Sequence, residues 1–191
     1  MEEMIRLFDI CDVNKSASSL NVDKLYWTNQ QHILRSTPGH LAKHLAPRLE
    51  GCGVSTTDDQ KLVAVAEVQQ ERARTLKEMA ENSLFFFRDV TGYEEKPAKK
   101  HLNESTAPLL EAVRNRLEAL PEWTAPAIHE AIMDVARENN AGMGKVAQPV
   151  RVAVSGGAVS PPIDVTLQVL GREATLDRLG RAITFARNPN R

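Results

Sequence analysis

This sequence has little of what would indicate a secreted or membrane-spanning protein. Among its 191 residues there are two cysteines, Cys11 and Cys52, which are too few for a disulfide framework and fit a reducing compartment. No apolar run approaches the ~18 residues that a bilayer-spanning helix needs, and the acidic start does not look like a signal sequence. We therefore expect a soluble, cytoplasmic protein without a membrane partner.

Aromatic residues are scarce, and neither sign of charge is in large excess. Aromatic side chains make up 5% of the residues, whereas Ala, Leu, Arg and Glu are abundant, and this composition favours helices over a β-sandwich or barrel. The net charge of -1 argues against a uniformly basic surface for nucleic acid. The end of the chain differs, because residues 143–191 contain seven Lys or Arg and three Asp or Glu. A locally positive end suits a phosphate-binding face, although a solvated arginine-rich helix would show the same excess.

Apolar residues recur at helical spacing between polar or Gly/Pro-rich stops. We expect helices at residues 2–11, 22–35, 40–49, 58–80, 108–120, 126–139, 145–155, 161–170 and from about 175. Asn21 is placed to cap the second of these helices, and Ser160 to cap the helix that ends at Gly171. Arg72 lies within the 58–80 helix, on or beside its packed face. Since strand-like alternation is weak throughout, the predicted fold class is all-α.

The main internal boundary is expected between Gly92 and Lys100. There the one aromatic cluster of the chain gives way to a stretch rich in Gly, Pro and Lys. We therefore predict a short helical piece at residues 1–36, a first helical domain at 37–94 and a second at 95–191.

Motifs for catalysis are absent or incomplete. Lys15 and Ser16 give a partial likeness to the ATP-binding KMSKS loop, but the second lysine and the Met are missing, and no Gly-rich phosphate loop is present. His40 and His44 have the i, i+4 spacing that suits zinc, yet no HExxH glutamate or cysteine pair supplies the further ligands. We expect no catalytic residue, no metal and no cofactor within this chain.

The segment 145–183 carries a long pattern with specific spacing, GK-x-AQP-x-R-x-A-x-S/T-G…SP…LG-x-E…RL-x-RAI. This pattern resembles the C-terminal anticodon-binding domain of bacterial glutamyl-tRNA synthetases. Near the start of the chain, Lys15 and Lys24 match the V-x-K-S-A…K-L-x-W-x-N pattern of the tRNA stem-contact region of that family, although Leu20 and Asn21 replace its usual Phe-Asp. The resemblance implies that both lysines approach the tRNA backbone, where a lysine positions the RNA without reading its sequence.

The resemblance covers nearly the whole chain but not the catalytic half of the family, which contains the HIGH and KMSKS elements. It implies the end of the stem-contact domain at residues 1–36, followed by two anticodon-binding domains that form an α-helix cage. The chain is thus expected to be an inactive fragment of glutamate–tRNA ligase, a class I aminoacyl-tRNA synthetase. The parent enzyme would be a monomer that attaches glutamate to tRNA(Glu) with ATP and Mg²⁺. The alternative is a helical protein–protein interaction domain without RNA binding.

The resemblance also assigns roles to four residues. Arg72 matches the arginine that recognises the third anticodon base, and Arg151, Ser160 and Ile163 match positions that surround the anticodon bases. From the residues alone, a structural ion pair is a more common role for arginines at such places than the reading of a base edge, and both roles stay open for Arg72 and Arg151. The family more often has Ser/Thr-Pro-Gly where this chain has Ser160-Pro161-Pro162, so a backbone amide at the third position is missing here.

Overall fold

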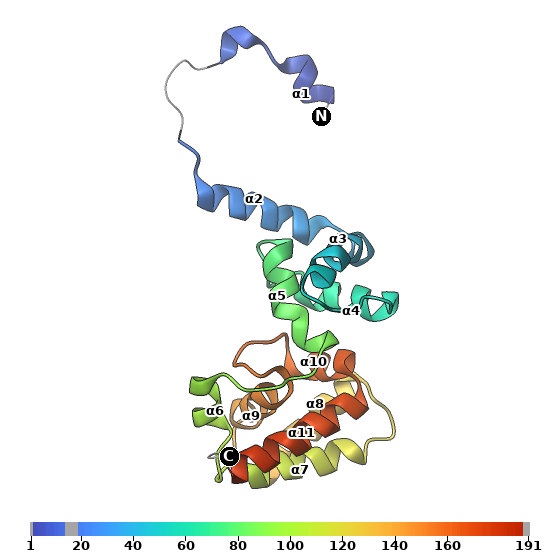
Figure 1. The fold of residues 1–191 in the computed structure, drawn as a ribbon, viewed down its shortest axis with the longest axis vertical. Coiled ribbons are helices and arrows are strands. Elements are labelled where there is room, and N and C mark those ends of the chain that lie inside the picture. Colours follow the sequence, from blue (N-terminus) through green and yellow to red (C-terminus); the bar gives the residue numbers. More distant parts are fainter. Residues whose placement is uncertain (1, 14–18, 189–191) are drawn as a thin grey trace.

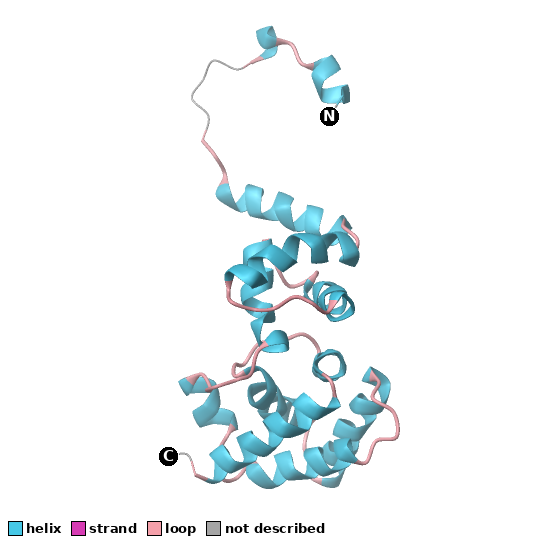
Figure 2. Ribbon diagram, turned by 45° about the vertical axis from the view of Figure 1, so that its right-hand side comes forward, coloured by secondary structure: helices cyan, strands magenta, loops and turns pink. Residues whose placement is uncertain are grey.

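The computed structural model describes residues 2–13 and 19–188, and these residues form helices joined by short loops (Figure 1, Figure 2). The elements are α1 (Glu2–Leu7), η1 (Ile10–Asp12), α2 (Val22–Arg35), α3 (Pro38–Gly51), α4 (Asp59–Gln69), α5 (Leu76–Phe87), α6 (Glu95–His101), α7 (Ala107–Glu118), α8 (Ala125–Glu138), α9 (Met143–Ser155), α10 (Ile163–Leu170) and α11 (Arg172–Arg187). No strand occurs in the described residues, and the all-α prediction is confirmed. None of the described helices combines the length and the apolar character needed to cross a bilayer.

Several helix ends follow the local sequence signals. Asn21 Oδ1 accepts a hydrogen bond from the Lys24 amide at 3.0 Å, which confirms Asn21 as the cap of α2. Gly156 follows α9 with a φ of 81°, and Gly171 follows α10 with a φ of 90°. A residue with a side chain rarely adopts such a positive φ, so glycine ends both helices.

Ser160 is not a helix cap, and this prediction is wrong. Helix α10 begins only at Ile163, after two consecutive prolines. A proline disfavours the helical conformation of the residue before it, so Pro162 keeps Pro161 out of the helix and α10 starts beyond Pro162. The Ser160 hydroxyl instead donates to the Pro161 carbonyl at 2.9 Å.

The predicted helix at residues 2–11 is also interrupted. Helix α1 ends at Leu7, and Asp9 accepts a hydrogen bond from the Cys11 amide at 2.8 Å, which begins the short η1. An aspartate that bonds to a nearby backbone amide competes with helix continuation. This local competition explains the interruption.

The predicted helix at residues 58–80 is two helices, α4 and α5, separated by a turn at 70–75. Thr75 caps α5, because its Oγ1 accepts a hydrogen bond from the Glu78 amide at 3.1 Å. In the turn, Gln70 Nε2 donates to the carbonyls of Ile33 at 2.8 Å and Ser36 at 2.7 Å, which ties the turn to the end of α2. The cap and these tertiary bonds together favour a turn over a continuous helix.

We expect Thr75→Ala to destabilise the protein by about 1 kcal/mol, because α5 loses its N-cap. The free energy of unfolding in urea measures this change. Thr184→Ala is the matched control, since Thr184 lies inside α11 and its exposed hydroxyl donates to the carbonyl of Gly180 on the same helix. Equal losses in the two variants would contradict a capping role for Thr75.

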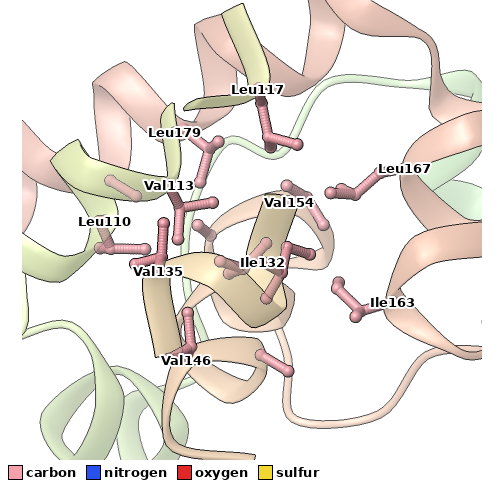
Figure 3. Packing of buried hydrophobic residues seen from close by; sticks show 14 of the residues in the cluster. Leu110, Val113, Leu117, Ile132, Val135, Val146, Val154, Ile163, Leu167 and Leu179 are labelled. Atoms are coloured by element: carbon pink, nitrogen blue, oxygen red, sulfur yellow. The ribbon is translucent and has the colours of Figure 1, made fainter. Parts of the chain in front are cut away.

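Buried apolar side chains form two separate clusters. The first cluster is contributed by the end of α2 and by α3–α5, and it consists of Ile33, Leu41, Ala42, Leu45, Leu49, Val54, Leu62, Val65, Ala66, Ala73, Met79, Ala80 and Phe86. The second cluster lies among α7–α11 and includes Leu110, Val113, Leu117, Ile132, Val135, Val146, Val154, Ile163, Leu167 and Leu179 (Figure 3). The domain boundary predicted at residues 94–95 lies between Phe86 and Leu102, the last and first buried members of these clusters; it remains a prediction.

The two clusters meet where α4 and α5 pack against α10 and α9. Val169 of α10 contacts the first cluster, although its helix belongs to the second. Figure 1 shows α5 above α9 and α10, with α2 on the far side of α3–α5. The contact between α5 and α9 thus joins the helix that follows the turn containing Arg72 to the helix that contains Arg151.

Candidate nucleic-acid interface

Arg151 and Ser160 form the centre of a hydrogen-bonded network between α9 and the loop that precedes α10. Arg151 Nε donates to Ser160 Oγ at 2.9 Å, and Arg151 Nη1 donates to Gln148 Oε1 at 2.6 Å. Thr166 Oγ1 lies 3.4 Å from Ser160 Oγ and donates to the Pro161 carbonyl at 3.1 Å. Ser160 and Thr166 are buried, so the network holds the Arg151 side chain in one orientation.

Arg151 keeps hydrogen-bonding capacity toward solvent. Its Nη2 has no hydrogen-bond partner among the described residues, and it is not one of their buried unpaired side-chain atoms. A guanidinium group has five N–H donors in a rigid fork. Arg151 therefore presents free donors from a side chain that is already held in place, which lowers the entropic cost of binding a ligand.

Arg72 is exposed in the turn between α4 and α5, where its amide donates to the Gln69 carbonyl at 2.9 Å. Its predicted place on the packed face of a helix is wrong, because the helix ends before it. Burial, and to a lesser extent the nearby positive charge of Arg72, lower the pKa of Arg151. The two arginines therefore lie close enough for their charges to interact.

Neither arginine is neutralised by a carboxylate within the described part of the chain. The ion pairs there involve other cations, such as Arg116 with Asp134, Arg181 with Asp177 and Arg187 with Glu111. The structural ion pairs that sequence considerations left open for Arg72 and Arg151 are thus not found among these residues. Two unneutralised guanidinium groups whose charges interact attract an anionic ligand and can donate to its hydrogen-bond acceptors.

The other predicted site residues take different positions. Ile163 is 4% exposed and packs in the second cluster, at the first residue of α10. Lys24 is exposed near the start of α2, and Figure 1 shows this helix separated from α9 and α10 by α3–α5. Lys15 lies outside the described residues. The structure thus joins Arg151 to Ser160 by a hydrogen bond, with the charge of Arg72 nearby, whereas Ile163 lies in the core of the second cluster.

Two residues of the network were not among the sequence predictions. Gln148 lies three residues before Arg151 on α9, so helical spacing could have indicated its contact with the guanidinium group. Thr166 had no such signal, because a single threonine in an apolar helix gives no indication of its partner.

The histidine pair does not extend to a metal site in this structure. His40 and His44 are exposed, and their ring centroids are 4.7 Å apart. The described residues contain no group of three or more His, Cys, Asp or Glu side chains arranged to hold a metal ion. A zinc site needs at least three protein ligands.

Comparison with known proteins gives concordant similarities. The family model described as "Anticodon binding domain" matches residues 40–183. Glutamate–tRNA ligase 2 of Halorhodospira halophila is 52% identical over 187 residues, which are 98% of this chain and 40% of that protein. Glutamate–tRNA ligase 1 of Alkalilimnicola ehrlichii is 53% identical over 185 residues, 97% of this chain and 39% of that protein. The chain thus spans about two fifths of the length of the curated relatives it matches.

Two solved structures have the same fold. A glutamate tRNA ligase from Elizabethkingia meningosepticum, in complex with its amino acid, superposes with a TM-score of 0.86 at 27% identity, covering 97% of this chain and 37% of that one. The glutamate–tRNA synthetase of Elizabethkingia anophelis gives a TM-score of 0.82 at 27% identity, over 96% of this chain and 36% of that one.

Proposed function

Since the chain belongs to the anticodon-binding domain family and corresponds to that domain of glutamyl-tRNA synthetases, we propose that it binds the anticodon stem-loop of tRNA(Glu). The observation that carries this proposal is the pair Arg72 and Arg151, two guanidinium groups that have no carboxylate partner in the described residues and are close enough for their charges to interact. Unpaired loop bases are recognised by hydrogen bonds to their Watson–Crick edges, for which arginine is a suitable donor.

In this proposal, Arg72 reads the third anticodon base. A cytosine presents two adjacent acceptors on its Watson–Crick edge, which match the fork of a guanidinium group, whereas guanine presents N–H donors on the same edge. Arg151, Ser160 and Ile163 surround the remaining anticodon bases. Lys24, together with Lys15, contacts backbone phosphates, and such contacts position the tRNA without reading it.

The proposal extends to the whole protein. The parent enzyme would be a monomeric, cytoplasmic ligase that activates glutamate with ATP and Mg²⁺ and transfers it to tRNA(Glu). This chemistry would belong to the part of the relatives that the chain does not match. The two clusters described here would select the tRNA for that reaction.

A binding titration at two salt concentrations tests the proposal. We expect the stem-loop with the glutamate anticodon to bind more tightly than a stem-loop of the same length with an unrelated loop sequence. The preference should persist at the higher salt concentration, because base contacts are less salt-dependent than phosphate contacts. Equal affinities for both loops would contradict recognition of the anticodon. No binding to either loop would instead favour the helical protein-interaction domain.

A further inference from the structure

Arg178 is a buried cation that lies outside the candidate interface. It projects from α11 and is 4% exposed. Its Nη1 donates to the Phe85 carbonyl at 2.8 Å and to the Val154 carbonyl at 2.6 Å, and its Nη2 donates to the Arg88 carbonyl at 3.0 Å. Burial lowers the pKa of Arg178, whereas Asp89, whose Oδ1 is 3.9 Å from Nη2, raises it.

The carbonyls that Arg178 contacts belong to the C-terminal ends of two helices. Phe85 is in the last turn of α5, and Val154 is in the last turn of α9. The last four carbonyls of a helix have no partner within that helix, and the partial negative charge there favours a cation. One guanidinium group therefore satisfies the ends of α5 and α9 at the same time.

These two helices belong to different clusters. Phe86 of α5 is buried in the first cluster, and Val152 and Val154 of α9 are buried in the second. The hydrogen bonds of Arg178 therefore join the two clusters through groups of the backbone, whose positions follow the helix axes. A change in the angle between α5 and α9 would break at least one of these bonds.

Stability alone is a weak reason to bury an arginine here. Among the described residues, Arg178 Nε is the one buried side-chain nitrogen or oxygen without a hydrogen-bond partner, and such a donor costs about 1–3 kcal/mol. Apolar side chains of similar volume often replace buried charged groups with little loss of stability. The geometric demand of three directed hydrogen bonds is the property that an apolar side chain would lack.

We propose that Arg178 is a positioning residue that sets the angle between α5 and α9 and thereby the separation of Arg72 and Arg151. Helix α5 has 12 residues and is about 18 Å long, with Arg72 beyond its far end. A rotation of about 10° at the Arg178 end would therefore shift the far end by roughly 3 Å. Recognition geometry tolerates about 0.5 Å, so such a shift would disturb the reading of a base. The second part of this inference rests on the proposed function.

Distance measurements between spin labels test the inference without RNA. Cys11 and Cys52, which are both exposed, are first replaced by serine. Exposed Lys43 in α3 and exposed Asn115 in α7 are then replaced by cysteine and spin-labelled. We expect one narrow distance distribution in the otherwise unchanged protein. Arg178→Met removes all three hydrogen bonds and should broaden this distribution or add a second distance. An unchanged distribution in folded Arg178→Met would overturn the inference.

Two control variants separate positioning from loss of stability. Arg187→Met makes the same change on the same helix, but Arg187 pairs at 2.6 Å with Glu111 on α7, a helix that packs with α11 around the second cluster. Leu179→Ala removes a fully buried side chain from the second cluster. Neither control should broaden the distribution. Broadening of equal size in Leu179→Ala would show that general destabilisation is the cause, and it would overturn the inference.

Arg178→Lys supplies a conservative variant. One ammonium nitrogen cannot occupy both Nη positions, so at least one carbonyl loses its partner and the distribution should fall between those of the unchanged protein and Arg178→Met. If Arg178→Met does not fold, Arg178→Lys decides the test, and an unchanged distribution in that variant overturns the inference.

The RNA readout distinguishes this inference from the proposed function. With stem-loops that differ only in the third anticodon base, the preference for C over G should be roughly 2- to 30-fold smaller in Arg178→Met than in the unchanged protein. If the unchanged protein shows no such preference while Arg178→Met broadens the distances, the proposed function fails and the positioning of the clusters stands. If the preference survives in folded Arg178→Met, the link from Arg178 to recognition is wrong.

Discussion

Arg72→Gln is expected to reduce the preference for a third anticodon base C over G by roughly 1–3 kcal/mol, or about 5- to 150-fold. Gln has a single amide nitrogen in place of the guanidinium fork, so it can no longer donate two parallel hydrogen bonds from two nitrogens to the adjacent acceptors of cytosine. Overall affinity should fall less than the preference, because phosphate contacts elsewhere are unchanged. Titrations with stem-loops that differ only in the third anticodon base measure both quantities.

The exposed position of Arg72 separates an effect on base recognition from an effect on stability. Because the side chain lies in a turn and not in the core, Arg72→Gln should leave the melting temperature nearly unchanged. Arg74→Gln is the matched control, since Arg74 is exposed in the same turn and the substitution removes the same charge. Arg74→Gln should weaken the binding of all stem-loops to the same extent or leave it unchanged. A folded Arg72→Gln that keeps the preference for C would show that Arg72 does not read the base.

In the parent ligase proposed above, Arg72→Gln should also relax the rejection of tRNA(Gln), whose anticodon ends in G. Aminoacylation assays with purified tRNA(Glu) and tRNA(Gln) would measure the ratio of kcat/KM for the two substrates. We expect the ratio to fall mainly through the noncognate tRNA.

Gly156→Ala is expected to cause a large loss of stability. Gly156 has a φ of 81°, and an added Cβ would lie 3.0 Å from the Gly92 carbonyl oxygen and 3.1 Å from Val90 Cγ1. The left-handed conformation costs about 1–2 kcal/mol for a residue with a side chain, and overpacking costs about 1–3 kcal/mol more. The free energy of unfolding in denaturant should therefore fall by roughly 2–5 kcal/mol.

Gly144→Ala, inside the helix that Gly156 ends, provides the control. Gly144 lies in α9, and an added Cβ there has no neighbour within 4 Å in the described structure. Alanine favours helix over glycine by about 0.8–1 kcal/mol, so this variant should be neutral or more stable. If Gly156→Ala and Gly144→Ala unfold at the same denaturant concentration, the turn after α9 relaxes more easily than its contacts indicate.

The turn at Gly156 also matters for the interface. The Gly156 carbonyl accepts a hydrogen bond from the Glu94 amide at 2.8 Å, which fastens the 87–94 segment to the loop that contains Ser160. Because Ser160 accepts from Arg151, a displaced turn would loosen the orientation of that guanidinium group. We therefore expect Gly156→Ala to weaken stem-loop binding even under conditions where the variant remains folded.

Local patterns in the chain were sufficient for the fold class and for the family. Periodic apolar residues and caps such as Asn21 act within one or two helical turns. They can therefore be recognised, like composition, from the sequence without knowledge of the fold. The same holds for the glycines after α9 and α10, because a positive φ at a helix end is a local demand. The spaced pattern at residues 145–183 identified the family for the same reason, since it is a property of the linear sequence.

Interactions between distant segments decided the rest. The break at residues 70–75 depends on Gln70 reaching the end of α2, more than thirty positions earlier in the chain. This break, and not helical periodicity, puts Arg72 in solvent. Arg178 donates hydrogen bonds to carbonyls 93 and 24 positions away in the chain, and no residue near Arg178 in the sequence predicts either partner. Helix periodicity indicates only which face of a helix is apolar. The partner of a buried polar group is determined by packing between helices, so it is defined only when the two clusters pack against each other.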